Sequence, residues 1–379
     1  MELILKQYDI PLLRFSATND SSTPEIEVHW INEDQRHLLP LDMELSPEGI
    51  SRWMRRRTIP RNRAYVNRLL AKCGLNANRP MGILALCKGL SVDDSYWVVE
   101  EGFEGTFEKY NLFENRFSEV LALIAFTGYG SSNRSSLASS PEFTTNGMLP
   151  KCWRRISGKV TLYKGGTDGG YNTGAEPYCE YYAAQVAAAM GIDAIPYGLS
   201  QWKGRLCSTC ELFTDIDHAY MPIGNLVQRG GFDAVAAYYE NLGEPFQKAF
   251  RDMLVFDAVI CNTDRHYGNF GFIIDNKTNT IAAPAPLFDH GNSLFNQAGP
   301  EDYESPEAFQ QYIDTLVPCV YDDFFATAKH FMTDENREQL RKLLGFRFKR
   351  HVRYNLPPKR LKLMEEQVRK RAMRLLENK

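Results

Sequence analysis

The sequence lacks any apolar run as long as the roughly 18 residues that a membrane-spanning helix needs. Its longest apolar-rich stretch, Tyr181 to Ile195, contains Gln185 and Asp193. The N-terminus has neither the basic start nor the apolar core of a secretory signal. The eight cysteines are too few and too scattered for a disulfide scaffold, which is typical of a reducing compartment. Together these absences predict a soluble, cytoplasmic protein that does not bind a membrane.

No single sign of charge dominates the composition, because 44 Lys and Arg residues stand against 47 Asp and Glu residues. The distribution along the chain is nevertheless uneven. Residues 47–80 contain nine basic residues and one acidic residue, and residues 341–379 contain fourteen basic residues and three acidic ones. The rest of the chain is therefore strongly acidic. Such asymmetry is typical of proteins that bind nucleic acid and of proteins whose own domains dock on one another.

The first of these basic segments predicts two short helices, over residues 47–59 and 62–73, with a proline between them. In a helix-turn-helix arrangement, the second helix would present Asn62, Arg63 and Asn67 to a groove of DNA. The alternative is a basic surface that is solvated or that docks on the acidic part of the chain. DNA as a partner is therefore an open prediction.

The order of the predicted elements indicates the fold class. A Gly/Ser-rich stretch from Gly128 to Ser140 predicts a linker or mobile loop, because it cannot bury enough apolar area. After it we expect a strand over residues 159–164, a helix over 177–190 and a β-hairpin over 269–288. This order predicts an α+β, two-lobed fold with a strand-rich lobe, a mainly helical lobe and an N-terminal accessory domain. The expected parts are residues 1–130 (accessory domain), 131–147 (loops), 148–214 (strand-rich lobe) and 215–379 (helical lobe).

Three polar residues around the predicted hairpin have the spacing that phosphoryl transfer requires. Asn269 follows Asp264 by five positions, and Asp289 lies beyond the hairpin. Transfer from ATP needs a carboxylate to accept the proton of the attacking hydroxyl, and an amide oxygen and a second carboxylate to hold Mg²⁺. Protein kinases place the same residue types at this spacing. Each residue alone could be a turn residue, but the three together favour phosphoryl transfer.

The run Asn262-Thr263-Asp264-x-His266-x-x-Asn269 resembles the catalytic signature of the HipA-like serine/threonine kinases, the toxins of bacterial toxin–antitoxin pairs. The resemblance implies a protein-kinase-like fold with ATP and Mg²⁺. It implies that Asp264 is the catalytic aspartate and that Asn269 and Asp289 bind the metal. His266 would orient the catalytic loop.

Two other segments resemble the nucleotide-binding parts of the same family. Lys164 ends the predicted strand and would contact the ATP phosphates, although a strand lysine can also be a solvated edge residue. Glu180 would form an ion pair with Lys164, and the alternative is a charge at the rim. Backbone groups around Glu211 and Phe213 would bind the adenine edge as a hinge.

A third segment, Thr144 to Lys151, resembles the family's loop over the ATP phosphates, with Gly147 and Lys151 as candidate ATP-binding residues. The family's autophosphorylated serine corresponds to Thr144, which is thus the candidate site of autophosphorylation. The neighbouring hydroxyls that could replace it are Ser139, Ser140 and Thr145.

The resemblance implies phosphorylation of a protein Ser or Thr, with a translation factor such as an aminoacyl-tRNA synthetase as target, growth arrest as outcome and an antitoxin as partner. Residues 1–130 lie outside it. Two alternatives remain open: a small-molecule phosphotransferase on the same scaffold, and a nucleotide-binding regulatory protein that binds DNA or a partner through its basic N-terminal helices.

Overall fold

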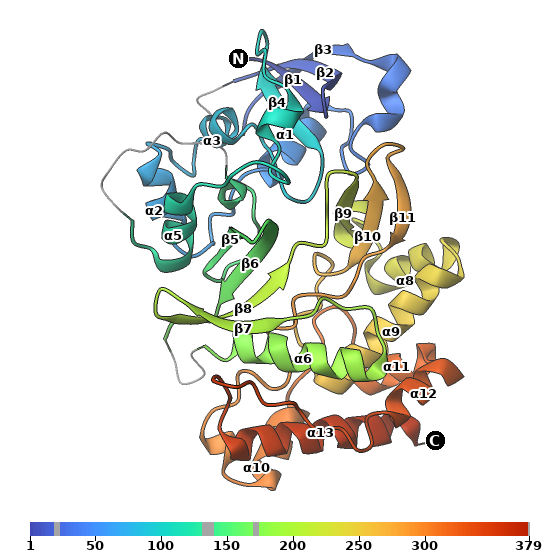
Figure 1. Cartoon of the computed structure of the whole chain (residues 1–379). Helices are drawn as coiled ribbons and strands as arrows, with labels where there is room; N and C mark the ends of the chain where they lie inside the picture. The colour runs from blue at the N-terminus through green and yellow to red at the C-terminus, as the bar shows by residue number, and fades with distance from the viewer. Residues whose placement is uncertain (19–22, 131–139, 170–173, 378–379) are drawn as a thin grey trace. The chain divides into compact units, whose positions relative to one another are not determined.

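The computed structural model describes residues 1–18, 23–130, 140–169 and 174–377. The chain forms two compact units, and Figure 1 labels most of their helices and strands. The predicted boundary near residue 130 lies inside the first unit, and residues 131–139 of the predicted loop lie outside the described residues. The first unit comprises Met1–Lys164, Glu211–Met221 and Ile273–Ala282, and the second comprises Gly165–Cys210, Pro222–Phe272 and Ala283–Lys379.

The first unit begins with an antiparallel sheet in the strand order β3-β2-β1-β4. Leu3 and Leu5 of β1 pair with Phe15 and Leu13 of β2. All four side chains are at most 2% exposed, because alternate residues of a strand point to the same face. Ile50 and Trp53 of the first helix pack into the same core. The strands are β1 (Glu2–Gln7), β2 (Ile10–Ala17), β3 (Ile26–Ile31) and β4 (Tyr96–Glu100).

Both predicted basic helices are present in this unit. The first starts at Ser46, whose Oγ accepts a hydrogen bond from the Gly49 amide and so caps the helix. The helical elements are η1 (Glu33–Leu38), α1 (Pro47–Arg56), α2 (Val66–Lys72), α3 (Pro80–Cys87), α4 (Phe107–Tyr110), α5 (Glu119–Thr127) and η2 (Pro141–Phe143).

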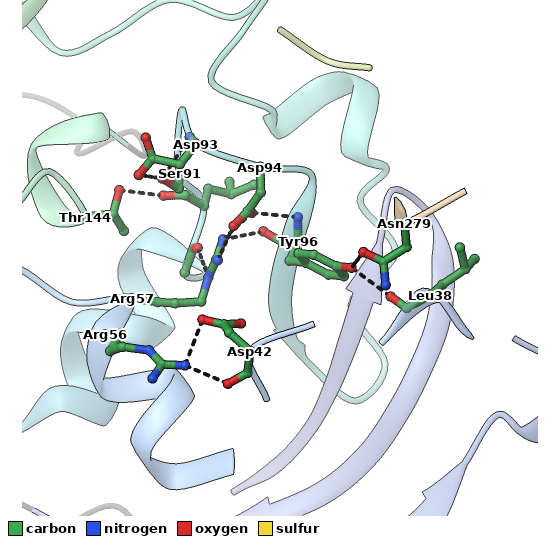
Figure 2. A network of polar contacts seen from close by, with 12 residues as sticks. Leu38, Asp42, Arg56, Arg57, Ser91, Asp93, Asp94, Tyr96, Thr144 and Asn279 are labelled. Atoms are coloured by element: carbon green, nitrogen blue, oxygen red, sulfur yellow. Dashed lines mark hydrogen bonds and ion pairs between the residues drawn. The ribbon is translucent and has the colours of Figure 1, made fainter. Parts of the chain in front are cut away.

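Two arginines of the basic segment are buried rather than presented to a partner. Arg57 makes a bidentate ion pair with Asp94, as Figure 2 shows. Arg63 is 2% exposed and pairs with the buried Glu142. The prediction that Arg63 faces a DNA groove is therefore wrong, because its charge is used inside the unit. Asn62 and Asn67 are exposed.

Two further strand groups complete the first unit. β5 (Lys151–Ile156) and β6 (Lys159–Gly165) form a hairpin that contains the predicted strand. The predicted hairpin over residues 269–288 is confirmed as β10 (Gly271–Asp275) and β11 (Thr280–Pro284), and they form a sheet with β9 (His218–Pro222). The Asp275 carboxylate accepts hydrogen bonds from the Lys277 and Thr278 amides and so fixes the hairpin turn.

The second unit is mainly helical, and it includes residues 165–210, which the expected bounds assigned to the strand-rich lobe. The predicted helix over 177–190 is confirmed as α6, and Gly191 ends it in the left-handed conformation that glycine favours. Its elements are α6 (Glu176–Met190), β7 (Gly198–Trp202), β8 (Arg205–Glu211), α7 (Ile223–Leu226), α8 (Gly231–Asn241), α9 (Glu244–Ile260), η3 (Glu301–Tyr303), α10 (Pro306–Asp314), α11 (Phe324–Phe331), α12 (Asp334–Arg341) and α13 (Pro358–Leu376).

The long helix α9 is the centre of this unit. Its residues Asp252 to Ile260 are all buried. The helix α13 packs its apolar stripe inside the unit, with Leu361, Met364 and Val368 fully buried. Arg371 of α13 donates a hydrogen bond to the Ala258 carbonyl of α9. Among the described residues, no helix is both long and apolar enough to span a bilayer.

Candidate active site

The predicted catalytic loop leaves the C-terminal end of the buried helix α9. Asp257 of that helix accepts hydrogen bonds from the backbone amide and the side-chain amide of Asn262. Asn262 in turn accepts a hydrogen bond from the Asp264 amide through its Oδ1. The position of Asp264 is thus set by a short chain of contacts that begins on a rigid helix.

The Asp264 carboxylate is held on one side and partly open on the other. Its Oδ2 accepts a 2.8 Å hydrogen bond from Nδ2 of Asn292. Asn292 is itself oriented, because its Oδ1 accepts from Asn296 and its carbonyl accepts from Thr263. Asp264 is half-buried, so the residue is in part accessible to a substrate hydroxyl. The contact between Asn292 and Asp264 was not predicted from the sequence.

Arg265 is a second residue whose contribution to the site was not predicted from the sequence. It is 1% exposed and makes a bidentate ion pair with Asp257. It also donates to the carbonyls of Asn269 and Phe288, at 3.1 Å and 2.7 Å. Burial alone would lower the pKa of Arg265, but Asp257 outweighs this effect and the pKa lies above its ordinary value.

The two predicted metal ligands have the donor atoms that magnesium prefers. Asn269 is 6% exposed, and its amide nitrogen donates to the Asp264 carbonyl, so its Oδ1 remains as an acceptor. Asp289 supplies a carboxylate. In the described part of the chain, no three His, Cys, Asp or Glu side chains gather into a metal site of their own. This set fits Mg²⁺, which is usually bound by one or two protein oxygens together with substrate phosphates.

The backbone at Asp289 has an uncommon conformation that its surroundings hold. Its φ is 57°, in the left-handed region. The Asp289 amide donates to the hydroxyl of Tyr197, and the next amide, of His290, donates to Oε2 of Glu180 at 2.8 Å. Burial raises the pKa of Tyr197 well above its ordinary value, so the hydroxyl stays protonated.

Glu180 is therefore not a rim charge, which was the alternative in the sequence analysis. It lies in α6 and is 0% exposed. Its contact with the His290 amide links α6 to the segment that carries Asp289. Lys164, its expected partner, belongs to the other compact unit.

His266 is exposed and contacts only its own loop in the contacts described. Its Nδ1 accepts a 3.0 Å hydrogen bond from the Gly268 amide, and its own amide donates to the Asp264 carbonyl. These contacts tighten the turn between Asp264 and Asn269. They match the loop-orienting role expected for His266 better than a role in proton transfer.

In the first unit, two lysines face each other across the β5–β6 hairpin. Lys151 and Lys164 are opposite in the register, and each is 6% exposed. A solvated edge position for Lys164 is therefore wrong. Gly147 has a φ of 90°, and a Cβ there would collide with Nζ of Lys151. The loop that contains Gly147 is thus fitted closely around the Lys151 ammonium.

Thr144 is buried at 4%, and its Oγ1 donates to the Leu90 carbonyl, as Figure 2 shows. Thr145 donates to the Pro141 carbonyl and accepts from the indole of Trp153. Ser140 is buried as well, and Ser139 lies outside the described residues. Phosphorylation of Thr144 would require this segment to open first.

The backbone of the predicted hinge is held against β6 at Leu212. The Leu212 amide donates to the Val160 carbonyl. Because successive residues of an extended chain direct their backbone groups to opposite sides, the backbone groups of Glu211 and Phe213 face away from Val160. The Glu211 side chain is exposed and pairs with Lys159, so only its backbone can serve as a hinge group.

The fold and this site define a class of protein: the chain has the fold of the HipA-like kinases. HipA of Shewanella oneidensis MR-1, solved with HipB and its operator DNA, superimposes with a TM-score of 0.53 at 12% identity, and the match covers 98% of this chain and 97% of that one. The resemblance that the catalytic signature indicated and the predicted α+β kinase-like fold are both confirmed. Residues 1–130, which the resemblance in sequence did not reach, are part of the shared fold.

The particular relatives are kinases. Serine/threonine-protein kinase CtkA of Helicobacter pylori is 27% identical over 135 residues, which cover 32% of this chain and 41% of the relative. The chain thus spans about two-fifths of the length of that relative. The crystal structure of the proinflammatory kinase CtkA of H. pylori matches with a TM-score of 0.48 at 16% identity, over 61% of this chain and 90% of that one. No family model matches the sequence.

Proposed function

We propose that this protein is an ATP- and magnesium-dependent serine/threonine protein kinase of the HipA-like type, acting in the cytoplasm. The placement of Asp264 is the observation that supports this most. Its backbone is tied to α9 through Asn262, one carboxylate oxygen is held by Asn292, and the residue remains accessible. A carboxylate that is fixed yet accessible is suited to accept a proton from an incoming hydroxyl.

In the reaction, Asp264 accepts the proton of the attacking Ser or Thr hydroxyl. The hydroxyl oxygen bonds to the γ-phosphorus, the bond from that phosphorus to the bridging oxygen breaks, and ADP leaves with the electron pair. Asn269 and Asp289 would hold Mg²⁺, which neutralises charge that builds up on the phosphates. His266 keeps the turn between Asp264 and Asn269 in shape.

The first unit would bind the nucleotide. Lys164 is the candidate contact to the α- and β-phosphates, and Gly147 and Lys151 would lie over the phosphates. The backbone groups of Glu211 and Phe213, which face away from β6, would hold the adenine edge. The burial of both lysines and the fit of Gly147 to Lys151 support this assignment.

The acceptor is proposed from the relatives. CtkA is named a serine/threonine-protein kinase, which favours a protein hydroxyl over a small molecule. We propose a translation factor such as an aminoacyl-tRNA synthetase as the target, with growth arrest as the outcome. HipA of Shewanella oneidensis was solved with HipB, which supports an antitoxin as partner of this chain as well.

The test is phosphate transfer by the full chain with Mg-ATP, followed by intact-mass analysis of the enzyme and of protein and small-molecule acceptors. We expect the wild type to phosphorylate a protein, and Asp264→Asn and Asp289→Asn to be inactive while still folded. Transfer to a small molecule alone would identify a small-molecule phosphotransferase. Transfer that survives Asp264→Asn would contradict the proposed site.

A second candidate function, nucleic-acid binding, is favoured by the segment before α13. Residues 339–364 contain nine Lys or Arg residues and no Asp or Glu. The backbone at Phe348 and Lys349 is held in place by hydrogen bonds. Gln185 accepts one from the Lys349 amide and donates one to the Lys349 carbonyl, and Glu365 accepts one from the Phe348 amide. Its backbone is thus anchored while its charges point outward. Between the end of α12 and α13, in residues 345–357, the exposed basic residues are Arg347, Lys349, Arg350 and Arg353.

Fluorescence anisotropy with a DNA duplex at several salt concentrations tests this candidate. Each phosphate contact contributes about 0.9 to the slope of log K against log salt. Replacing the four exposed basic residues with Ala should therefore weaken binding and reduce the slope by about 3 to 4. The matched control is the triple variant of Arg52, Arg55 and Arg61, which are exposed in the N-terminal basic segment, residues 47–80. If only the control weakens binding, the interface lies there instead.

A further inference from the structure

All three side-chain nitrogens of Arg265 donate hydrogen bonds to residues of the second unit. Nε and Nη2 donate to the two carboxylate oxygens of Asp257, at 2.9 Å and 3.1 Å. Nη1 donates to the carbonyls of Asn269 and Phe288. Nη2 also lies 3.0 Å from Nδ1 of His290. The planar fork of arginine allows one side chain to reach all of these acceptors.

The other acceptors belong to Asn269, Phe288 and His290, which lie at or next to the two proposed metal ligands. Asn269 is itself a proposed ligand, and Phe288 and His290 are the residues on either side of Asp289, the other proposed ligand. A single nitrogen of Arg265 therefore contacts both backbone segments that carry the ligands. That nitrogen bridges the two segments, in addition to the β10–β11 hairpin that joins them.

We propose that Arg265 is a positioning residue that sets the spacing of Asn269 and Asp289 and thereby the affinity of the site for the metal–nucleotide complex. The inference rests on the proposed kinase function and adds a determinant of metal binding to it. Arg265 touches neither metal nor substrate in this assignment. It acts through Asn269 and Asp289.

The remaining contacts of Arg265 show why its own position is fixed. Asp257 lies in α9 and is 0% exposed. Because arginine can only donate, Nδ1 of His290 must be the acceptor, so the neutral ring carries its hydrogen on Nε2. His290 is thus held at its ring by Arg265 and at its amide by Glu180. These contacts keep Asp289 in its left-handed conformation.

A purely stabilising role explains this arrangement less well. A buried ion pair contributes little net stability compared with apolar side chains of similar volume, because both charges must be removed from water. Residues behind metal ligands, in contrast, typically change metal affinity 10- to 100-fold when replaced. Arg265 has the contacts of such a residue.

The matched control is Arg371, another buried arginine next to the same part of α9. Its Nε donates to the Ala258 carbonyl, one residue after Asp257, and it is 6% exposed. It contacts neither metal-ligand segment in the contacts described. Arg371→Lys should therefore lower thermal stability without changing metal affinity.

The experiment measures Mn²⁺ binding by electron paramagnetic resonance in the presence of a non-hydrolysable ATP analogue, well below the melting temperature of each variant. We expect Arg265→Lys to weaken Mn²⁺ binding about tenfold or more, and Arg371→Lys to leave it within about twofold. In turnover, Arg265→Lys should raise the KM for Mg-ATP more than it lowers kcat. If Arg265→Lys does not fold, Asp257→Asn, which removes the charge and keeps only one of the two acceptor oxygens, replaces it.

Unchanged Mn²⁺ affinity in Arg265→Lys, or an equal loss in Arg371→Lys, would overturn the inference and leave the kinase proposal standing. A wild type that binds Mn²⁺ and nucleotide but transfers no phosphate would overturn the kinase proposal alone, and the comparison of variants would still decide the role of Arg265. A wild type that binds no Mn²⁺ with the nucleotide would overturn both.

Discussion

Asn292 donates a 2.8 Å hydrogen bond to Oδ2 of Asp264, from the loop that also carries Asp289. The proposed base and one proposed metal ligand are therefore coupled through a short loop. A change in that loop moves the base as well as the metal site. This coupling explains why Asn292 is itself fixed by Asn296 and Thr263.

Replacement of Asn292 by Ala should lower kcat by about 10- to 100-fold, because a hydrogen bond to a charged group contributes about 1.5–3 kcal/mol. The KM for ATP should change little, since Asn292 touches Asp264 and not the proposed nucleotide contacts. Steady-state kinetics check this. Asn296→Ala, which removes only the support behind Asn292, should have a smaller effect. An Asn292→Ala enzyme with wild-type kcat would contradict the positioning of Asp264.

Replacement of Gly147 by Ala should raise the KM for ATP at least tenfold, because the new Cβ displaces Nζ of Lys151. Gly158→Ala is the matched control. Gly158 has a φ of 85°, close to the 90° of Gly147, but a Cβ there would meet nothing within 4 Å. Both variants should lose about 1 kcal/mol of stability from the positive φ. An equal KM in both would show that the Gly147 loop does not cover the nucleotide.

The elements that could be predicted from the sequence are those with local signals. The helix over 177–190 ends at Gly191, and the hairpin turn has Asp275 as its side-chain cap. Asp264 and Asn269 could be proposed as site residues because they lie five positions apart within one motif. Such features need only neighbouring residues to be recognised.

The features that sequence reasoning missed depend on partners far along the chain. Arg57 pairs with Asp94, and Arg63 pairs with Glu142, and charge counting alone did not show that these arginines are buried. Arg265 pairs with Asp257, which lies eight positions earlier, near the C-terminal end of α9. This contact can be recognised only once the end of that helix is known. No local pattern reports whether a charged side chain will be buried.

Replacement of Arg57 by Ala should destabilise the protein by about 3–5 kcal/mol, because it removes a buried guanidinium and leaves the partly buried Asp94 carboxylate without its charge partner. Chemical denaturation measures the change. The control is Arg55→Ala in the same helix, whose exposed side chain should change stability by less than about 0.5 kcal/mol. Equal effects would mean that the Arg57–Asp94 pair does not hold α1 in place.

Asp93 should make stability fall as the pH rises. Burial, then the neighbouring Asp94, raise the pKa of Asp93 from 3.8 to about 6, although Ser91 and Arg57 oppose the shift. Figure 2 shows its contact with Ser91. Between about pH 4 and 6 the folded protein keeps a proton on Asp93 that the unfolded chain has lost, so folding is favoured at the lower pH and this contribution is gone above about pH 6.

The shift of about two units corresponds to at most about 3 kcal/mol. The measurement is the free energy of unfolding of wild type and Asp93→Asn across pH 4 to 7. The Asn variant should lose this slope, because its amide does not titrate. Asp275 should have the opposite pH dependence. Hydrogen bonds from the Thr278 and Lys277 amides lower the pKa of Asp275, so the stability that its carboxylate contributes is lost as the pH falls, and Asp275→Asn should remove this loss. If Asp93→Asn keeps the wild-type slope between pH 4 and 6, another buried acid such as Glu142 must carry it, since burial raises its pKa as well.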